Sequence, residues 1–182
     1  MIVKFIGTGL AVCAQQLGGI DMGIYNTEGH GLNYDFMGAV ELIATINNLS
    51  TSPMNTMIEL GCGDGEMTSL FAMSHIFKEI HAIGDGVHPQ FYHNTSHWDN
   101  ITKSFGEENL EFADESIDFV YIHGSRNIEG IIKKYMPKLR VGGMIGGNGY
   151  LLNNEKVMVE IEQSLGEPDA IFGDSSWIKV VK

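Results

Sequence analysis

Basic residues are few in this sequence. Its 182 residues include 11 lysines and arginines against 23 aspartates and glutamates, so the formal net charge is −12 at pH 7. A charge of this sign repels phosphate backbones and anionic lipid surfaces, and no basic run longer than Lys133-Lys134 offsets it. The composition therefore disfavours nucleic acids and membranes as partners, and solubility is the simplest reason for the acidity.

Cysteines and long apolar stretches are also scarce. Cys13 and Cys62 give neither a disulfide framework nor a metal-ligand spacing, which fits a reducing compartment. No segment is apolar for long enough to span a bilayer. Glycines interrupt the apolar run within residues 1–14, where we expect an edge strand or hairpin rather than a leader peptide. We therefore expect a cytoplasmic protein.

Strand-like and helix-like patterns alternate through the rest of the chain. We expect strands at short apolar or β-branched runs and helices where apolar residues recur at near-helical spacing. The predicted strands are 57–60, 79–83, 117–122 and one that begins at 144–145, with a closing hairpin of 170–172 and 177–181. The predicted helices are 36–48, 66–74, 98–105, 128–139 (stopped by the glycines at 142–143) and 154–165, and 50–55 is a predicted loop. This order is typical of an α/β domain with a mainly parallel sheet.

The stretch MIELGCGDGEMTSLFA, residues 57–72, contains alternating glycines between an apolar strand and a helical pattern. Gly61, Gly63 and Gly65 permit positive φ angles and remove the Cβ atoms that would hold a ligand away. A loop from a strand into a helix also presents free N–H groups and the positive end of the helix dipole. Parallel sheets bind ligands at this edge, so we predict a cofactor site here.

The spacing of the glycines distinguishes between two classes of cofactor. A dinucleotide motif, G-x-G-x-x-G, would need glycine where Glu66 stands, and a carboxylate at the helix start opposes a pyrophosphate. A zwitterionic ligand without phosphate is tolerated better at this position. The loop therefore disfavours a dinucleotide oxidoreductase.

The run ELGCGDG, residues 59–65, resembles the first motif of class I S-adenosylmethionine-dependent methyltransferases. Residues 110–120 and 135–143 resemble the family's segments before its fourth and fifth strands, and the likeness is closest to short O-methyltransferases of sugars, macrolides and antibiotics. The resemblance implies a Rossmann-like sandwich with a seven-stranded, mainly parallel sheet and a C-terminal antiparallel hairpin. It also implies one domain, with an N-terminal extension over 1–35 and a cofactor-binding core over 36–182.

The resemblance also implies which residues bind S-adenosylmethionine. Glu59 would meet the amino group of the ligand, directly or through water. The residues expected to line the methionine end with it are Gly61, Cys62, Gly63 and Gly65.

The nucleoside end is assigned in the same way. Asp85 lies about 20 residues past the glycine loop and would take the ribose hydroxyls, although a shift of one residue would put Gly84 there. Glu107 or Glu108 would face the adenine, and solvated surface charges are an equal alternative for both.

The sequence departs from the metal-dependent members of the family. Where they carry carboxylates at the ends of the fourth and fifth strands, this chain has His123, Asn148 and Gly149. Mg²⁺ prefers several hard oxygen ligands, so we predict no metal at this site. His123 is the candidate catalytic residue, a general base beside the cofactor; a structural hydrogen bond to a neighbouring loop is the alternative.

The segment 88–99 is rich in histidine and aromatic residues. His93 and His97 have the i, i+4 spacing of metal ligands on a helix, but no third ligand follows at a recognised spacing. Phe91, Tyr92 and Trp98 suit stacking against a ring. We favour an acceptor lid, with an ordinary surface loop as the alternative.

Two functions remain open from the sequence. The first is methyl transfer from S-adenosylmethionine to a hydroxyl of a small molecule, without metal. The second is a degenerate binding module or partner subunit of the same fold. An aminopropyltransferase would need an acidic pair after the fourth strand, which this chain lacks. The negative net charge disfavours DNA methylation. The oligomeric state is left open, a homodimer included.

Overall fold

The computed structural model describes residues 35–50, 52–86, 88–106, 110–124, 127–151 and 155–182. The strands are β1 (Met54–Leu60), β2 (Phe77–Gly84), β3 (Ile101–Phe105), β4 (Ile117–Ile122), β5 (Leu139–Gly147), β6 (Ala170–Ile171) and β7 (Trp177–Val180). The helices are α2 (Asp35–Leu49), α3 (Glu66–Met73), α4 (Pro89–Thr95), α5 (Ile128–Tyr135) and α6 (Glu155–Leu165), and a 3-10 helix, η2 (Met136–Lys138), follows α5.

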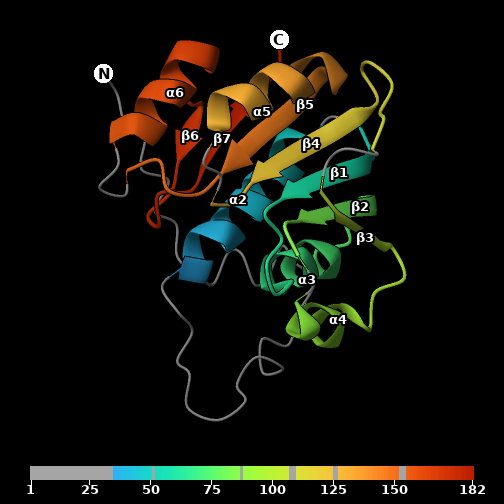
Figure 1. The fold of residues 1–182 in the computed structure, drawn as a ribbon. Coiled ribbons are helices and arrows are strands. Elements are labelled where there is room, and N and C mark those ends of the chain that lie inside the picture. The colour runs from blue at the N-terminus through green and yellow to red at the C-terminus, as the bar shows by residue number, and fades with distance from the viewer. Residues whose placement is uncertain (1–34, 51, 87, 107–109, 125–126, 152–154) are drawn as a thin grey trace.

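These strands form one seven-stranded sheet in the order β3-β2-β1-β4-β5-β7-β6 (Figure 1). The first five pair in parallel, whereas β7 runs antiparallel to β5 and to β6. The strand order reverses between β1 and β4, the point at which open α/β sheets bind ligands. The predicted α/β sandwich with a closing antiparallel hairpin is confirmed.

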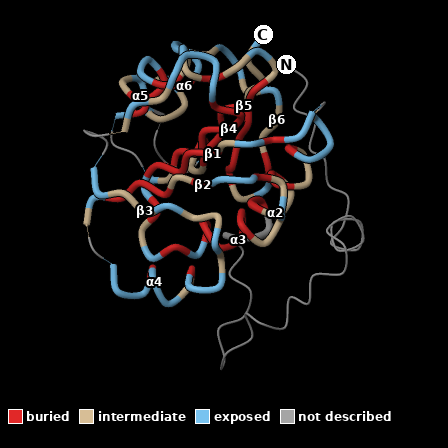
Figure 2. Tube along the Cα trace, turned by 90° about the vertical axis from the view of Figure 1, so that its right-hand side faces the viewer, coloured by how far each residue is buried: buried red, intermediate tan, exposed pale blue. Residues whose placement is uncertain are grey.

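Helices cover both faces of the sheet. Figure 1 shows α5 and α6 on one face and α2 and α3 on the other. Adjacent residues of β1 serve the two layers, because Met57 packs with α2 and α3 whereas Ile58 packs with α5 and α6. A parallel strand buried on both faces reads as a continuous apolar run, and Figure 2 shows the buried segments concentrated in these central strands.

The predicted helix over 98–105 is wrong. Residues Ile101–Phe105 form the edge strand β3, which pairs in parallel with β2 from Ile80↔Ile101 to Gly84↔Phe105. The β-branched Ile101 and Thr102 favour a strand. An exposed edge strand lacks the apolar run of the buried ones, so its pattern is weak in the sequence.

The predicted helix over 128–139 is too long. It ends at Tyr135, and Leu139 already begins β5. The glycines at 142–143 lie inside β5 rather than ending the helix. Gly142 has φ +75°, and the pairing of β4 with β5 shifts its register beside them, which marks an irregularity of the ladder.

The predicted loop over 50–55 extends too far, because β1 begins at Met54. Asp118 of β4 explains the extension. Its carboxylate oxygen Oδ2 accepts hydrogen bonds from the backbone N–H groups of Asn55 and Thr56, each at 2.8 Å. A tertiary contact of this kind leaves no local signal in the sequence.

Two further predictions concern the N-terminal extension and membrane-spanning segments. The N-terminal extension and Cys13 lie outside the described residues. In the part of the chain that the structure describes, no helix combines the length and apolar character needed to cross a bilayer.

Candidate cofactor site

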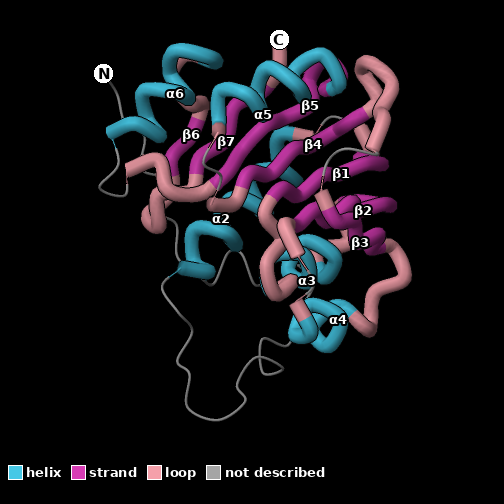
Figure 3. The backbone as a smooth tube through the Cα atoms, viewed as in Figure 1, coloured by secondary structure: helices cyan, strands magenta, loops and turns pink. Residues whose placement is uncertain are grey.

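The glycine loop lies at the carboxyl edge of the sheet, between β1 and α3. Because β1 and β4 pair in parallel, the residues that follow each strand meet at this edge (Figure 3). Gly61, Gly63 and Gly65 have φ angles of +85°, +48° and +85°, all in the left-handed region that favours glycine. The predicted need for a sharply bent backbone is therefore met at all three positions.

The three glycines differ in what surrounds them. A Cβ on Gly61 would stand 2.1 Å from the carbonyl oxygen of His123, and one on Gly65 would stand 2.7 Å from Cδ2 of Phe91. Among the described residues, a Cβ on Gly63 would meet only the Gly61 oxygen, at 3.9 Å. Gly61 and Gly65 thus allow close packing within the protein, whereas Gly63 faces the open space that a ligand needs.

Glu59 lies beneath the loop and is fully buried. Its Oε2 accepts a hydrogen bond from Oγ1 of Thr68 at 2.5 Å, but its Oε1 is buried without a partner in the described structure. Burial raises the pKa of this carboxyl to about 7, although the Thr68 hydroxyl and the Lys103 charge oppose the rise. A buried acceptor without a donor costs free energy, so Oε1 fits an N–H group of a ligand or a bridging water.

His123 follows β4 and lies beside this loop. Its backbone N–H donates to the Leu60 carbonyl at 2.8 Å, which fixes the end of β4 against the end of β1. The next residue connects the site to β5, because the N–H of Gly124 donates to Oδ1 of Asn148 at 3.3 Å. Burial lowers the pKa of the His123 imidazole, and the Asp64 carboxylate partly opposes this.

Lys103 lies at the candidate site and was not among the residues predicted from the sequence. Its Nζ lies 2.5 Å from Sγ of Cys62 and 4.3 Å from the ring centroid of Phe91. A lysine in a helix over 98–105 would not be placed here; only the parallel pairing of β3 with β2 brings it to the loop. Recognising residues 101–105 as a strand would have placed Lys103 near the edge of the sheet that carries the loop.

The residues predicted to bind the nucleoside end of the cofactor show no hydrogen bond or ion pair with the loop in the described structure. Asp85 is exposed and follows the last residue of β2, with no hydrogen bond or ion pair among the described residues. Glu107 and Glu108 lie outside the described residues. The structure therefore brings together Glu59, the glycine loop and His123, and Lys103 reaches the same loop through Cys62.

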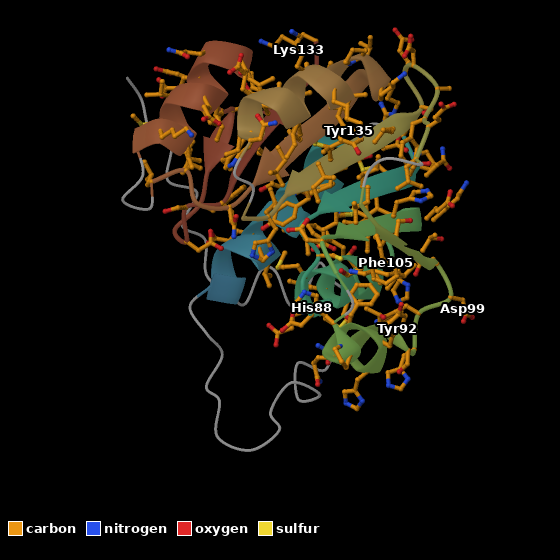
Figure 4. The ribbon with its side chains drawn as sticks, in the orientation of Figure 1. His88, Tyr92, Asp99, Phe105, Lys133 and Tyr135 are labelled. Carbon is orange, nitrogen blue, oxygen red and sulfur yellow. The ribbon has the colours of Figure 1, made fainter. Side chains whose placement is uncertain are left out.

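The aromatic residues of segment 88–99, where we expected an acceptor lid, are not all available for stacking, and the lid stays a prediction. Its helix α4 packs on α3, and Phe91 is buried against Gly65 instead of being open for stacking. Trp98 packs edge-on against the His75 ring, at 5.8 Å between centroids. Tyr92 is half exposed, and Figure 4 shows it near His88 on the side of the molecule opposite to α5.

No group of three or more histidine, cysteine, aspartate or glutamate side chains in the described ranges could hold a metal ion. His93 and His97 are therefore not joined by a third described ligand. The metal-free chemistry expected from His123, Asn148 and Gly149 stays a prediction.

The sheet order is that of the Rossmann-like fold of class I S-adenosylmethionine-dependent methyltransferases. Three of the solved structures with this fold show the extent of the likeness. The tRNA (m1A58) methyltransferase TrmI from Aquifex aeolicus aligns with a TM-score of 0.61 and 9% identity, over 91% of this chain and 73% of that one. The N-methyltransferase NodS from Bradyrhizobium japonicum gives 0.54 and 15%, over 76% and 91%. A precorrin-6y C5,15-methyltransferase from Geobacter metallireducens gives 0.53 and 20%, over 68% of each.

These likenesses establish the fold and leave the substrate open. One of the three is named for tRNA, one for precorrin-6y and one only as an N-methyltransferase, and the identities are low. The chain spans about half of another matched protein, YcgJ of Bacillus subtilis, with 47% of that protein covered. No sequence-family model matches this chain, and the comparison with curated proteins gives no match.

Proposed function

We propose that the protein binds S-adenosylmethionine in the glycine loop and transfers its methyl group to a hydroxyl of a small molecule without a metal ion. One observation carries this proposal. The buried Oε1 of Glu59 has no hydrogen-bond donor among the described residues, and it lies beneath a loop in which Gly63 faces open space. An ammonium group is the donor that best satisfies a buried carboxylate oxygen.

S-adenosylmethionine would supply a methyl group that its sulfonium has already activated. The protein's main contribution is then alignment of this group with the acceptor. Glu59, Gly61, Cys62 and Gly63 would hold the amino-acid end, with Glu59 as the charged contact. The carboxylates at Glu59, Asp64 and Glu66 also favour a ligand with net positive charge over a pyrophosphate.

His123 would take the proton from the acceptor hydroxyl. Burial lowers the pKa of its imidazole, so at neutral pH the ring is unprotonated and able to accept a proton. Its backbone is fixed on both sides, by Leu60 and by the contact with Gly61. A base held by the same loop that holds the cofactor keeps a constant distance from it.

A second function has its own support. The positions that carry metal-binding carboxylates in related enzymes hold His123, Asn148 and Gly149, as expected for a module that has kept the fold and lost catalysis. Such a protein would still bind the cofactor or its product. Binding alone therefore cannot separate the two functions, and an acceptor screen is needed.

The first experiment measures binding of S-adenosylhomocysteine by calorimetry and by the shift in melting temperature. We expect binding by the wild type and none by Gly63→Val, which puts a branched side chain in the open space. Gly166→Val is the matched control, because Gly166 has φ +74° with nothing near its Cβ position and lies after α6, away from the loop. Binding of NAD instead would overturn the proposal.

The second experiment incubates the protein with methyl-labelled S-adenosylmethionine and a panel of hydroxylated small molecules, followed by mass spectrometry. Labelled product that depends on His123 supports the enzyme. Tight binding without any methylated product would favour the binding module. Nucleic acids belong in the panel as a contrast, since the net charge of −12 disfavours them.

A further inference from the structure

Lys103 lies where the carboxyl ends of three strands meet. It belongs to β3 and pairs with Ala82 of β2. Its Nζ contacts Sγ of Cys62 in the loop after β1, and it lies 2.7 Å from where a Cβ on Gly84, the last residue of β2, would stand. A side chain at Gly84 would displace the ammonium group, so this glycine allows the lysine to reach the loop.

Lys103 acts on the buried Glu59 carboxyl through its charge, but it forms no close ion pair with any carboxylate among the described residues. In the described ranges no carboxylate oxygen lies within 4 Å of its Nζ; the groups around it are a thiol and the rings of Phe91 and Phe105, at 4.3 and 5.7 Å. A thiol sulfur is a weak acceptor. The ammonium group therefore keeps donors for a ligand, in a protein with few cations to offer.

In nucleotide-binding sheets, the end of the second strand carries the residue that contacts the ribose. An acid about 20 residues beyond the glycine loop accepts hydrogen bonds from the ribose hydroxyls, and a cation near the same place accommodates a ribose phosphate. Here Gly84 ends β2, and the acid that follows it, Asp85, is exposed. The ammonium group of Lys103 lies beside both the end of β2, at Gly84, and the loop, at Cys62.

We propose that Lys103 binds the ribose of the cofactor, donating hydrogen bonds from its ammonium group to the ribose oxygens in place of an accepting carboxylate. The inference rests on the proposed function, since it concerns the nucleoside end of the same cofactor. It has a consequence for specificity. A carboxylate needs hydroxyl groups that donate, whereas an ammonium group needs only acceptors and favours an added negative charge.

Phe105 completes this end of the site. Its ring is half exposed, lies near the Lys103 ammonium group and follows it on β3; Figure 4 shows it beside α4. An exposed aromatic ring is a stacking surface for a base. A nucleoside with its ribose on Lys103 would have its base within reach of this ring.

The test compares Lys103→Met, Lys103→Arg and the control Lys78→Met. Lys78 is an exposed lysine of β2 near its amino end, so its loss changes the net charge equally without touching the loop. We expect Lys103→Met to weaken S-adenosylhomocysteine binding about tenfold or more, as for a lost hydrogen bond to a charged group. Lys103→Arg should retain most of the affinity, and Lys78→Met should bind as the wild type does. Melting curves of the free proteins check that each variant is folded.

A second readout tests the sign of the interaction. Adenosine and adenosine 2′-monophosphate are each used to displace S-adenosylhomocysteine. The phosphate should compete better than adenosine on the wild type, and this advantage should vanish in Lys103→Met and shrink with added salt. If the wild type and Lys103→Met bind S-adenosylhomocysteine equally and the phosphate gives no advantage, the inference is wrong while the proposed function stands. If the wild type binds no S-adenosylhomocysteine, the proposed function itself fails and this inference with it.

Discussion

The carbonyl oxygen of His123 occupies the space where a side chain on Gly61 would begin, with only 2.1 Å between that oxygen and the Cβ position. The candidate base and the candidate cofactor loop are therefore in backbone contact. The His123 N–H also donates to Leu60, the residue before this glycine. Movement at one of the two positions is passed directly to the other.

Gly61→Ala should be costly for this reason. The new methyl group must push the His123 carbonyl away, and alanine at φ +85° is strained as well. We expect a loss of about 2 to 4 kcal/mol in the free energy of unfolding, measured with urea, and a lower turnover. Gly166→Ala carries similar strain without the contact and should cost about 1 kcal/mol. Equal losses in the two variants would contradict the role assigned to the contact.

His123→Ala should lower turnover by roughly 10²-fold or more with little change in cofactor affinity, as expected for a group used in the transition state. Because burial lowers the pKa of His123 below its usual 6.5, wild-type activity should rise with pH through a value below 6.5 and then level off. The measurement is the pH profile of kcat. Near wild-type turnover on a confirmed acceptor would mean that His123 is structural.

Chelation tests the metal prediction. With His123, Asn148 and Gly149 in place of carboxylates, methyl transfer should survive EDTA and show no dependence on Mg²⁺. His123→Asp supplies one carboxylate only, so added Mg²⁺ should not restore its activity. An activity that EDTA removes and Mg²⁺ restores would show that ligands come from elsewhere in the chain.

The central elements of this fold are visible in the sequence because their signals are local. The strand Ile117–Ile122 is a continuous β-branched and aromatic run and was predicted at its observed bounds. The glycine loop is likewise readable, since positive φ angles require glycine irrespective of what packs around them. The sheet and its antiparallel closing strands follow from the order of such elements.

What the sequence hides depends on contacts between distant strands. Lys103 reaches the loop only because β3 pairs with β2, and the edge strand that carries it has no strong pattern of its own. The sequence gives no sign that Phe91 is buried, because its burial depends on the packing of α4 against Gly65. That Glu59 Oε1 is buried with no hydrogen-bond partner in the described part of the chain is visible only in the folded structure.

Asp118 should be a major determinant of stability, although it lies outside the site. It is buried and joins three strands, because it binds two N–H groups of β1 through Oδ2 and Nε of Arg140 on β5 through Oδ1, at 2.6 Å. Asp118→Ala leaves these donors unpaired and should cost about 3 kcal/mol or more. Asp114→Ala removes an exposed ion pair with Lys138 and should cost under about 1 kcal/mol. Urea unfolding of both variants decides between these values.

Glu59 should make the stability of the free protein depend on pH. Its pKa is about 7 in the folded protein against 4.5 as the reference value, so between these values the folded state keeps a proton that the unfolded state has lost. The free energy of unfolding therefore falls as pH rises through this window, by roughly 3 kcal/mol for this group alone. Glu59→Gln cannot ionise and should lose less stability between pH 5 and 8, measured by denaturation at each pH.

The same carboxyl should release a proton when the ammonium group of a ligand binds beside it. An ammonium group at Oε1 favours the ionised form and lowers the pKa of Glu59, so near pH 6.5 the wild type gives up part of a proton on binding S-adenosylhomocysteine. Calorimetry in two buffers with different ionisation enthalpies measures this release. Glu59→Gln should bind more weakly and release less. If both proteins bind with the same affinity and the same proton release, the ligand does not contact Glu59, and the unpaired oxygen beneath the glycine loop has another partner.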